Sequence, residues 1–401
     1  MAARPIADLL ELSPDFIKDP YPVYAALRAR GPVHQVRDPK GTELWIVVGH
    51  DACRTAFTDP RLSRDWIKKG PPNPAMGVGP DLPALTNMLM SDPPDHTRLR
   101  RLVARGFTAR RVEAMAPRVQ EIADELLDAM AANEERRADL VASFAFPLPM
   151  TVICELLGVP ELDRTAFRGW SNEIVAPTDP ERQGNAFREI AAYLRELVQE
   201  KRARSGDDLL SALIHVVDEG GDRLSPDELI GMSFLILVAG HETTVNLIAN
   251  GMRALFAHPD QLAQVRADPD LLGGAVEEML RYEGPLENST MRLALEDVEM
   301  GGTVVPAGST VLISVADADR DPARFKDPER FDIHRDARGH LAFGHGLHHC
   351  LGAPLARLEG RIAVRGLLDR FPALTPDTDE GELSWLPGML IRGVRELPVR
   401  W

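Results

Sequence analysis

Ten consecutive residues, Phe343 to Gly352 with the sequence FGHGLHHCLG, place three glycines around one of only three cysteines in the chain. A thiolate that holds iron needs backbone N–H groups close to its sulfur, and such close turns require residues without a Cβ. The ring of Phe343 can shield the sulfur from water, and Pro354 suits the first turn of a following helix. The spacing therefore indicates that Cys350 is an iron ligand.

Two other interpretations fit the same loop. Cys350 with His345, His348 and His349 could form a zinc site, because imidazole and thiolate are ordinary zinc ligands. Zinc motifs usually separate two pairs of ligands by a loop, however, and the chain contains neither CxxC nor HExxH. A buried, inert cysteine is the commonest state of a free thiol.

A second chemical pattern lies in the longest predicted helix. Residues 225–228 (Ser-Pro-Asp-Glu) form a capping box with proline at the first helical position, and the helical pattern continues to about Ala257. Residues 229–240 are apolar almost all round, so we expect them in the core.

Polar residues interrupt this apolar helix. The sequence Ala-Gly-His-Glu-Thr-Thr at 239–244 brings a carboxylate, Glu242, and two hydroxyls into a stretch that should be buried. Glutamate is almost never fully buried unless it is paired, and such a local conflict usually marks a functional site. The alternative is that Glu242 points to solvent and Thr243 bonds back to its own helix.

The composition limits the class of protein. The 401 residues, 44% of them hydrophobic, can bury a large core, and no linker or repeat divides them, so we expect one domain over residues 1–401. Three scattered cysteines are typical of a reducing cytoplasm. The N-terminus shows no signal segment, and the longest apolar run is shorter than the roughly 20 residues that span a bilayer. The net charge of −15 argues against nucleic acid as a partner.

That charge is unevenly spread. Between His96 and Arg111 the chain has six arginines and no carboxylate. A solvated helix face is the ordinary interpretation, and a basic surface that docks an acidic protein is the alternative.

The coarse pattern predicts a mostly α protein with small peripheral β-sheets. Short strands are expected near 42–48, helices dominate from 94 to 259, and brief strands with turns follow Arg292. A last long helix is expected over 354–371.

Together these motifs resemble the cytochrome P-450 family. The loop around Cys350 matches Phe-Gly-x-Gly-x-His-x-Cys-x-Gly at every position, and residues 239–243 match the family's Ala/Gly-Gly-x-Asp/Glu-Thr. Between them, Glu278 and Arg281 fit Glu-x-x-Arg, although such a pair is by default an exposed ion pair. Residues 319–322 depart from Asn-Arg-Asp-Pro by having Asp319 in place of Asn. The resemblance covers about 19–399 and implies the P-450 fold, with haem between the central helix and the cysteine loop.

The resemblance also implies site residues and a cofactor, haem b, with O2 as co-substrate. Cys350 would be the axial ligand, while Glu242 and Thr243 would deliver the protons that O–O cleavage requires. Glu278 and Arg281 would form a structural pair. The expected contacts to haem are His96, Arg100, Arg292, Phe343, Gly344, His348, Cys350 and Gly352.

The implied function is a haem-thiolate monooxygenase that inserts one oxygen atom of O2 into a C–H bond, by hydroxylation or epoxidation. The likeness is strongest to the soluble bacterial branch that tailors macrolides and other polyketides. No flavin or nicotinamide domain is evident, so a ferredoxin and a ferredoxin reductase, fed by NADPH or NADH, should supply electrons to a cytoplasmic monomer. The alternatives are a steroid, terpenoid or fatty acid substrate, a peroxide-driven enzyme and a non-catalytic haem sensor; the acid–alcohol pair speaks against the peroxide-driven enzyme.

The substrate is expected to be bulky, apolar and mostly neutral. The loop at 70–94 contains seven prolines and three methionines, which suits an adaptable lid. Glu287 and Asn288 are expected to supply polar contacts that orient the guest. The predicted pocket residues are Met88, Met90, Leu237, Ala239, Leu286, Glu287, Asn288, Met389 and Leu390.

Overall fold

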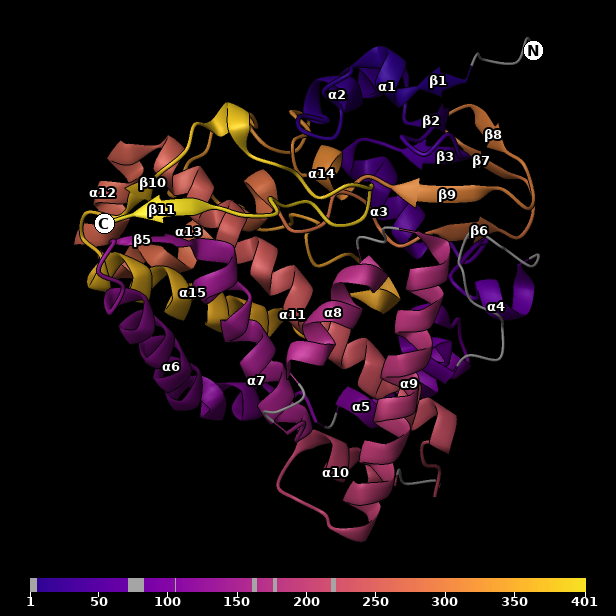
Figure 1. The fold of residues 1–401 in the computed structure, drawn as a ribbon. Coiled ribbons are helices and arrows are strands. Elements are labelled where there is room, and N and C mark those ends of the chain that lie inside the picture. Colours follow the sequence, from indigo (N-terminus) through magenta and orange to yellow (C-terminus); the bar gives the residue numbers. More distant parts are fainter. Residues whose placement is uncertain (1–5, 71–82, 105, 161–163, 176–178, 218–220) are drawn as a thin grey trace.

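The computed structural model describes residues 6–70, 83–104, 106–160, 164–175, 179–217 and 221–401. Helices form most of it, and the sheets gather at one end of the molecule (Figure 1). The predicted fold class, mostly α with small peripheral sheets, is confirmed.

The α-helices are α1 (Leu9–Leu12), α2 (Tyr21–Arg30), α3 (His50–Thr58), α4 (Trp66–Lys69), α5 (Asp95–Ala104), α6 (Ala109–Ala131), α7 (Pro147–Leu157), α8 (Arg164–Val175), α9 (Pro180–Ala203), α10 (Leu209–His215), α11 (Pro226–Ala257), α12 (Pro259–Ala267), α13 (Leu272–Glu283), α14 (Val315–Ala318) and α15 (Ala353–Arg370). Single helical turns of other types are η2 (Pro83–Leu85), η3 (Met88–Met90), η4 (Val141–Ala145), η6 (Pro269–Leu271), η7 (Gly346–His348) and η8 (Glu380–Glu382).

The main sheet has six strands in the order β1-β2-β3-β9-β6-β4, and smaller sheets pair β10-β11-β5 and β7-β8. The strands are β1 (Ala7–Asp8), β2 (Val33–Arg37), β3 (Glu43–Val47), β4 (Leu62–Ser63), β5 (Arg137–Asp139), β6 (Arg292–Ala294), β7 (Val298–Met300), β8 (Thr303–Val305), β9 (Thr310–Ile313), β10 (Thr375–Pro376) and β11 (Pro398–Arg400). In the main sheet, β3 pairs parallel with β9, with Trp45 opposite Val311. The antiparallel pair of β4 and β6 sets Ser63 opposite Leu293, which brings the segments around residues 64 and 292 together.

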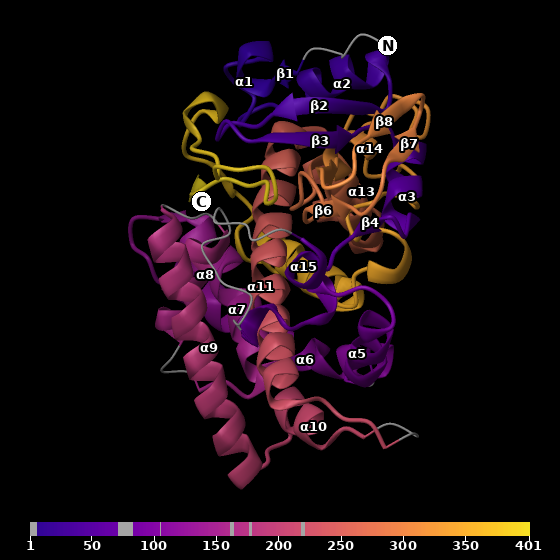
Figure 2. The ribbon, with the colours of Figure 1, turned by 90° about the vertical axis from the view of Figure 1, so that its right-hand side faces the viewer.

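Helix α11 runs through the middle of the molecule, from the main sheet toward α10 (Figure 2). The predicted capping box is present: Glu228 N donates to Ser225 Oγ at 3.2 Å, and Ser225 N donates to Glu228 Oε2 at 2.8 Å. The helix ends at Ala257, as predicted. It is long and apolar enough to cross a membrane, but 78% of its most apolar window is buried inside the protein, so it is the central core helix.

The core surrounds this helix. The largest hydrophobic cluster joins α11 to α6, α7, α9, α13 and α15. Two smaller clusters fill the space between the main sheet and α3, and between the N-terminal helices and β2–β3. Gly231 lets η2 approach α11 closely, because a Cβ at this position would lie 2.1 Å from the carbonyl oxygen of Thr86.

Candidate active site

The loop before α15 holds Cys350. Gly344 and Gly346 have φ angles of +71° and +73°, a conformation that favours glycine, as the spacing of the motif requires. Cys350 N donates to Phe343 O at 2.9 Å, so the loop folds back on itself. The Cys350 side chain keeps accessible surface, yet the surrounding protein desolvates it and raises the pKa of the thiol. Backbone hydrogen bonds from Gly352 and Ala353 and the charge of Arg100 lower that pKa and would stabilise a thiolate.

A cluster of arginine and histidine side chains, named the cation cluster after its arginines, lies beside this loop. The rings of His96 and His348 have centroids 4.2 Å apart, and the charges of Arg64, Arg100 and Arg292 act on His348. Burial, helped by Arg64 and Arg100, lowers the pKa of His96 to about 4, and burial with all three arginines lowers that of His348 to about 2. Burial likewise lowers the pKa of Arg292 to about 10 and that of Arg64 well below its usual value.

Several polar atoms of this cluster lack hydrogen-bond partners. Within the described part of the chain, Arg64 Nε, both ring nitrogens of His96, and Arg292 Nε and Nη2 are buried and make no hydrogen bond. Unpaired buried donors are costly, so this cluster is arranged to receive an anion from outside the chain. The two propionates of haem b fit it, and Cys350, two residues after His348, would hold the iron.

Arg64 was not predicted. Nothing in its neighbourhood in the sequence marks it, because it reaches the cluster only through the pairing of β4 with β6, the strand that begins with Arg292. Of the predicted contacts, Arg100 also ties α5 to the cysteine loop, because its Nη2 donates to His349 O at 2.7 Å. The zinc interpretation finds no support: in the described ranges no three His, Cys, Asp or Glu side chains come together as a metal site.

One face of α11 keeps accessible surface in the middle of the core. Ala239 is exposed and Thr243, one turn later, is half-buried, whereas His241 and Thr244 are buried. Thr243 Oγ1 donates to Ala239 O at 2.8 Å, so Thr243 does bond back to its own helix, as the alternative interpretation expected. The expectation that Glu242 points to solvent is wrong, because this residue is only 8% exposed. Its Oε2 atom lies 3.4 Å from Nε2 of His241, a residue to which the sequence assigned no role.

The pair formed by Glu278 and Arg281 is completely buried, so the default expectation of an exposed ion pair is wrong here. Arg281 donates two hydrogen bonds to Glu278, at 2.7 and 2.8 Å. It also donates to the backbone oxygens of Asp319, Pro328 and Arg330. The contact to residue 319 uses the backbone, so the replacement of Asn by Asp leaves it intact.

The predicted pocket residues divide into two groups. Ala239 and Leu390 are exposed, and Met88, Met90 and Leu286 are half-buried, so these side chains have surface that a guest could cover. Leu237 is fully buried in the main core, and Met389 packs in the N-terminal cluster, so these two side chains do not face a guest. Part of the predicted lid, 71–82, lies outside the described residues.

Glu287 and Asn288 are corrected as well. Both are buried, and Tyr24 OH donates to Glu287 Oε1 while Asn288 Nδ2 donates to Met389 O at 2.8 Å. Their polar atoms therefore hold α2 and the 388–391 turn in place instead of orienting a guest. The expectation failed because Tyr24 is 263 residues away in sequence, so the sequence gave no sign of this partner.

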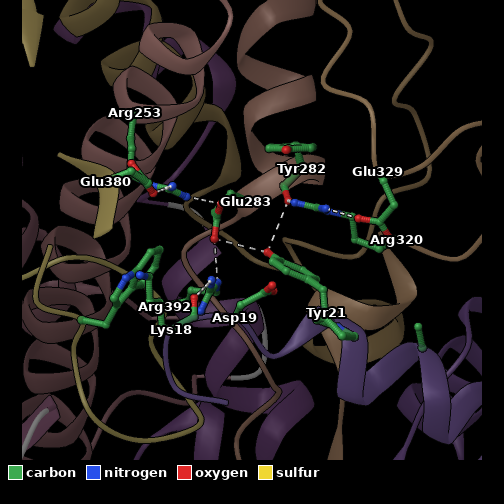
Figure 3. Close-up of a pocket in the computed structure, with 13 residues that line it drawn as sticks. Lys18, Asp19, Tyr21, Arg253, Tyr282, Glu283, Arg320, Glu329, Glu380 and Arg392 are labelled. Atoms are coloured by element: carbon green, nitrogen blue, oxygen red, sulfur yellow. Dashed lines mark hydrogen bonds and ion pairs between the residues drawn. The ribbon is translucent and has the colours of Figure 1, made fainter. Parts of the chain in front are cut away.

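Two surface cavities lie away from the exposed face of α11. The first, of about 420 Å³, is lined by residues from α2, α11, α13 and the C-terminal segment, and most of its charged side chains are paired with one another: Arg253, Glu283, Arg320, Glu329, Glu380 and Arg392. Figure 3 shows Glu283 at its centre, with Arg253 and Arg392 directed at the carboxylate. The second, of about 330 Å³, adjoins the cysteine loop and is bordered by Arg54, Arg324, Arg338 and Arg357.

Known proteins are similar to this chain in sequence and in fold. The sequence model of the family described as Cytochrome P450 matches residues 173–392. The cytochrome P450 monooxygenase PikC of Streptomyces venezuelae is 59% identical over 401 residues, which cover 100% of this chain and 95% of that protein. The 6-deoxyerythronolide B hydroxylase of Saccharopolyspora erythraea is 49% identical, covering 97% of each.

A solved structure agrees with the fold. The tirandamycin C-bound P450 monooxygenase TamI matches with a TM-score of 0.90 and 43% identity, over 98% of this chain and 99% of that one. The cation cluster, the cysteine loop and the full-length likeness lead to one conclusion: the chain belongs to the cytochrome P450 family and is a haem-thiolate monooxygenase that uses haem b and O2.

Proposed function

We propose that this monooxygenase oxidises a C–H bond of a large, mostly neutral polyketide macrolactone. The observation that carries the proposal is the full-length likeness to a hydroxylase named for 6-deoxyerythronolide B, joined by a likeness to an enzyme solved with tirandamycin C. Apolar side chains with accessible surface, among them Met88, Met90 and Leu390, suit such a guest.

The proposed roles of the residues follow from their places. His96, Arg64, Arg292 and His348 would hold the propionates, and Cys350 would hold the iron. Haem bound there supplies the oxygen-activating redox chemistry, and the thiolate favours O–O cleavage. On the distal side, Ala239 leaves room for a small molecule, while Thr243 and Glu242 hold and move protons at Oγ1 and at the carboxyl oxygens.

Electrons would come from a ferredoxin and its reductase, delivered to the basic cavity beside the cysteine loop. Its four arginines border the segment that carries the ligand, and Glu277 is the only carboxylate recorded among its lining residues in the described structure. The arginine-rich stretch before Arg111 contributes less than its composition suggests, because Arg98 is paired with Asp222 and Glu228. We further propose that the enzyme works as a cytoplasmic monomer.

The carbon monoxide difference spectrum of the reduced protein tests the ligand assignment. Cys350→Ala should lose the thiolate-type band, whereas Cys154→Ala, a change at a buried cysteine of the core, should retain it. Survival of that band in Cys350→Ala would overturn the assignment.

The substrate class is tested by titrating macrolactone aglycones, amino-sugar macrolides, steroids and fatty acids while following the haem spin state. Neutral aglycones should give the tightest binding with the largest high-spin fraction, and NADH consumed with a reconstituted redox chain should yield an oxygenated product. Tight binding restricted to the steroids, the fatty acids or the cationic macrolides would overturn the proposed class.

A further inference from the structure

His241 is a buried titratable residue for which haem binding gives no role. Its ring lies where α11 meets α8, and its side chain is fully buried. Three polar contacts surround it: Nδ1 lies 2.7 Å from Leu237 O, and Nε2 lies 2.9 Å from Ser171 Oγ and 3.4 Å from Glu242 Oε2.

These contacts fix the orientation of the ring. A carbonyl oxygen can only accept, so Nδ1 carries the hydrogen that it donates to Leu237 O. In the neutral ring Nε2 accepts the hydroxyl hydrogen of Ser171, and in the cationic ring Nε2 donates. In both states Nε2 stays beside the carboxyl group of Glu242.

Packing alone does not require an imidazole here. The ring meets the edge of Phe146 with centroids 5.7 Å apart, in a largely apolar part of the core. An apolar side chain of similar size would fill this space without the cost of burying two polar nitrogens. Among the contacts recorded for the described residues, His241 is also the only side chain that meets the Glu242 carboxylate.

We propose that His241 is a positioning residue for proton delivery, an inference that rests on the proposed role of Glu242. Held by Leu237 O and Ser171, the imidazole places Nε2 beside one oxygen of the Glu242 carboxyl group, and a hydrogen carried by either of these two atoms fixes that oxygen. The second oxygen is then free to exchange a proton. Because Ser171 belongs to α8, the position of α8 affects the orientation of the His241 ring.

Four variants of the holoenzyme test this with a reconstituted redox chain. Glu242→Gln should lower the product formed per NADH. His241→Phe should lower it by about tenfold, which is less than the rate factor that a positioned acid usually contributes. His241→Gln, whose amide can still donate to Glu242, should recover most of the loss. Ser233→Ala is the matched control: its buried hydroxyl bonds to Leu229 O on the same helix, outside the site.

The combination of variants separates the possible causes. His241→Phe added to Glu242→Gln should cause no further loss, because the imidazole acts through that carboxyl group. An unchanged yield in Glu242→Gln would overturn the proposed role of Glu242 and this inference with it. A loss in Glu242→Gln but not in His241→Phe would overturn the inference alone. Ser171→Ala should lower the product formed per NADH less than His241→Phe does. Equal losses in the two variants would mean that the imidazole only holds α8 and α11 together.

A spectroscopic measurement is independent of turnover. In ¹⁵N-histidine-labelled reduced protein with carbon monoxide bound, the His241 signals can be identified by their absence in His241→Phe. They should report hydrogen on Nδ1, and the Nε2 resonance should move in Glu242→Gln but not in Ser233→Ala. An unmoved Nε2 resonance in Glu242→Gln would contradict the proposed contact.

Discussion

The backbone amide of Leu341 donates a hydrogen bond of 2.6 Å to Asp319 Oδ1, and this bond joins the end of α14 to the segment that leads into Cys350. Asp319 stands where the family motif has Asn. Its second oxygen, Oδ2, is buried and makes no hydrogen bond to any described residue. Burial raises the pKa of Asp319 to about 7, although His340, the Leu341 amide and Arg281 act to lower it.

Asp319→Asn should therefore change how stability depends on pH. The folded protein binds the Asp319 proton more tightly than the unfolded chain, whose pKa is about 3.9. The stabilising contribution is thus complete below about pH 4 and is lost as the pH rises to about 7. Asn keeps the acceptor for Leu341 and cannot ionise. Between pH 5 and pH 8 the free energy of unfolding of the variant should therefore rise relative to that of the parent, by an amount on the order of a few kcal/mol.

Melting temperatures at pH 5 and pH 8 check this, with the exposed-site variant Asp336→Asn as the control. The same difference between variant and parent at both pH values would mean that Asp319 does not titrate in the folded protein.

Arg281→Met should destabilise the protein severely. It leaves the Glu278 carboxylate buried without its bidentate partner, a change that typically costs about 3–5 kcal/mol. The double variant Glu278→Gln/Arg281→Met should be more stable than the single one, because the remaining ion pair of Glu278, to Arg335 at 3.2 Å, does not replace the bidentate one. Denaturant unfolding of the holoprotein measures the stability of both variants. Equal stability would show that the buried charge of Glu278 is not the cause of the destabilisation.

Arg64→Met should weaken the retention of haem. The guanidinium is buried with an unpartnered Nε, and a charge-assisted bond to a propionate is worth about 1.5–3 kcal/mol. Transfer of haem to an apoglobin should accelerate by about tenfold or more. Arg61→Met is the control, because Arg61 is already paired with Asp59. Equal transfer rates in the two variants would place Arg64 outside the cofactor site.

Thr243→Ala should uncouple the enzyme while preserving its binding functions. The hydroxyl, which bonds to Ala239 O, makes no contact in the described structure that haem binding would need. Loss of a positioned proton donor should divert electrons to hydrogen peroxide and lower the product formed per NADH by about tenfold or more. Thr244→Ala, at the buried neighbour, serves as the control. Unchanged coupling would remove Thr243 from the relay.

Arg54→Glu and Arg101→Glu should slow reduction by an acidic ferredoxin. Both side chains are exposed, and opposite charge mainly accelerates association, an effect that salt screens. Stopped-flow reduction should therefore differ from the parent at low ionic strength and converge at high ionic strength, with substrate affinity unaltered. Arg182→Glu, on α9, is the control. Arg105, a further docking candidate in the arginine-rich stretch between His96 and Arg111, lies outside the described residues.

The sequence alone determined the chemistry of this protein. The glycines around Cys350 and the polar break in the apolar helix depend on local geometry: a close turn, a capping box, a carboxylate where the pattern demands apolar residues. Each of these depends on residues that are neighbours in the sequence, which is why the cofactor, the central helix and the fold class could be predicted.

Tertiary structure decided which side chains share a space. Arg64 joins Arg292 only because β4 pairs with β6, and His241 meets Ser171 only because α8 packs across α11. Glu287 and Asn288 turn away from the proposed guest because Tyr24, on α2, offers their polar atoms a buried partner. Such contacts join segments as many as 264 residues apart, and the direction in which a side chain points depends on the partner it finds there.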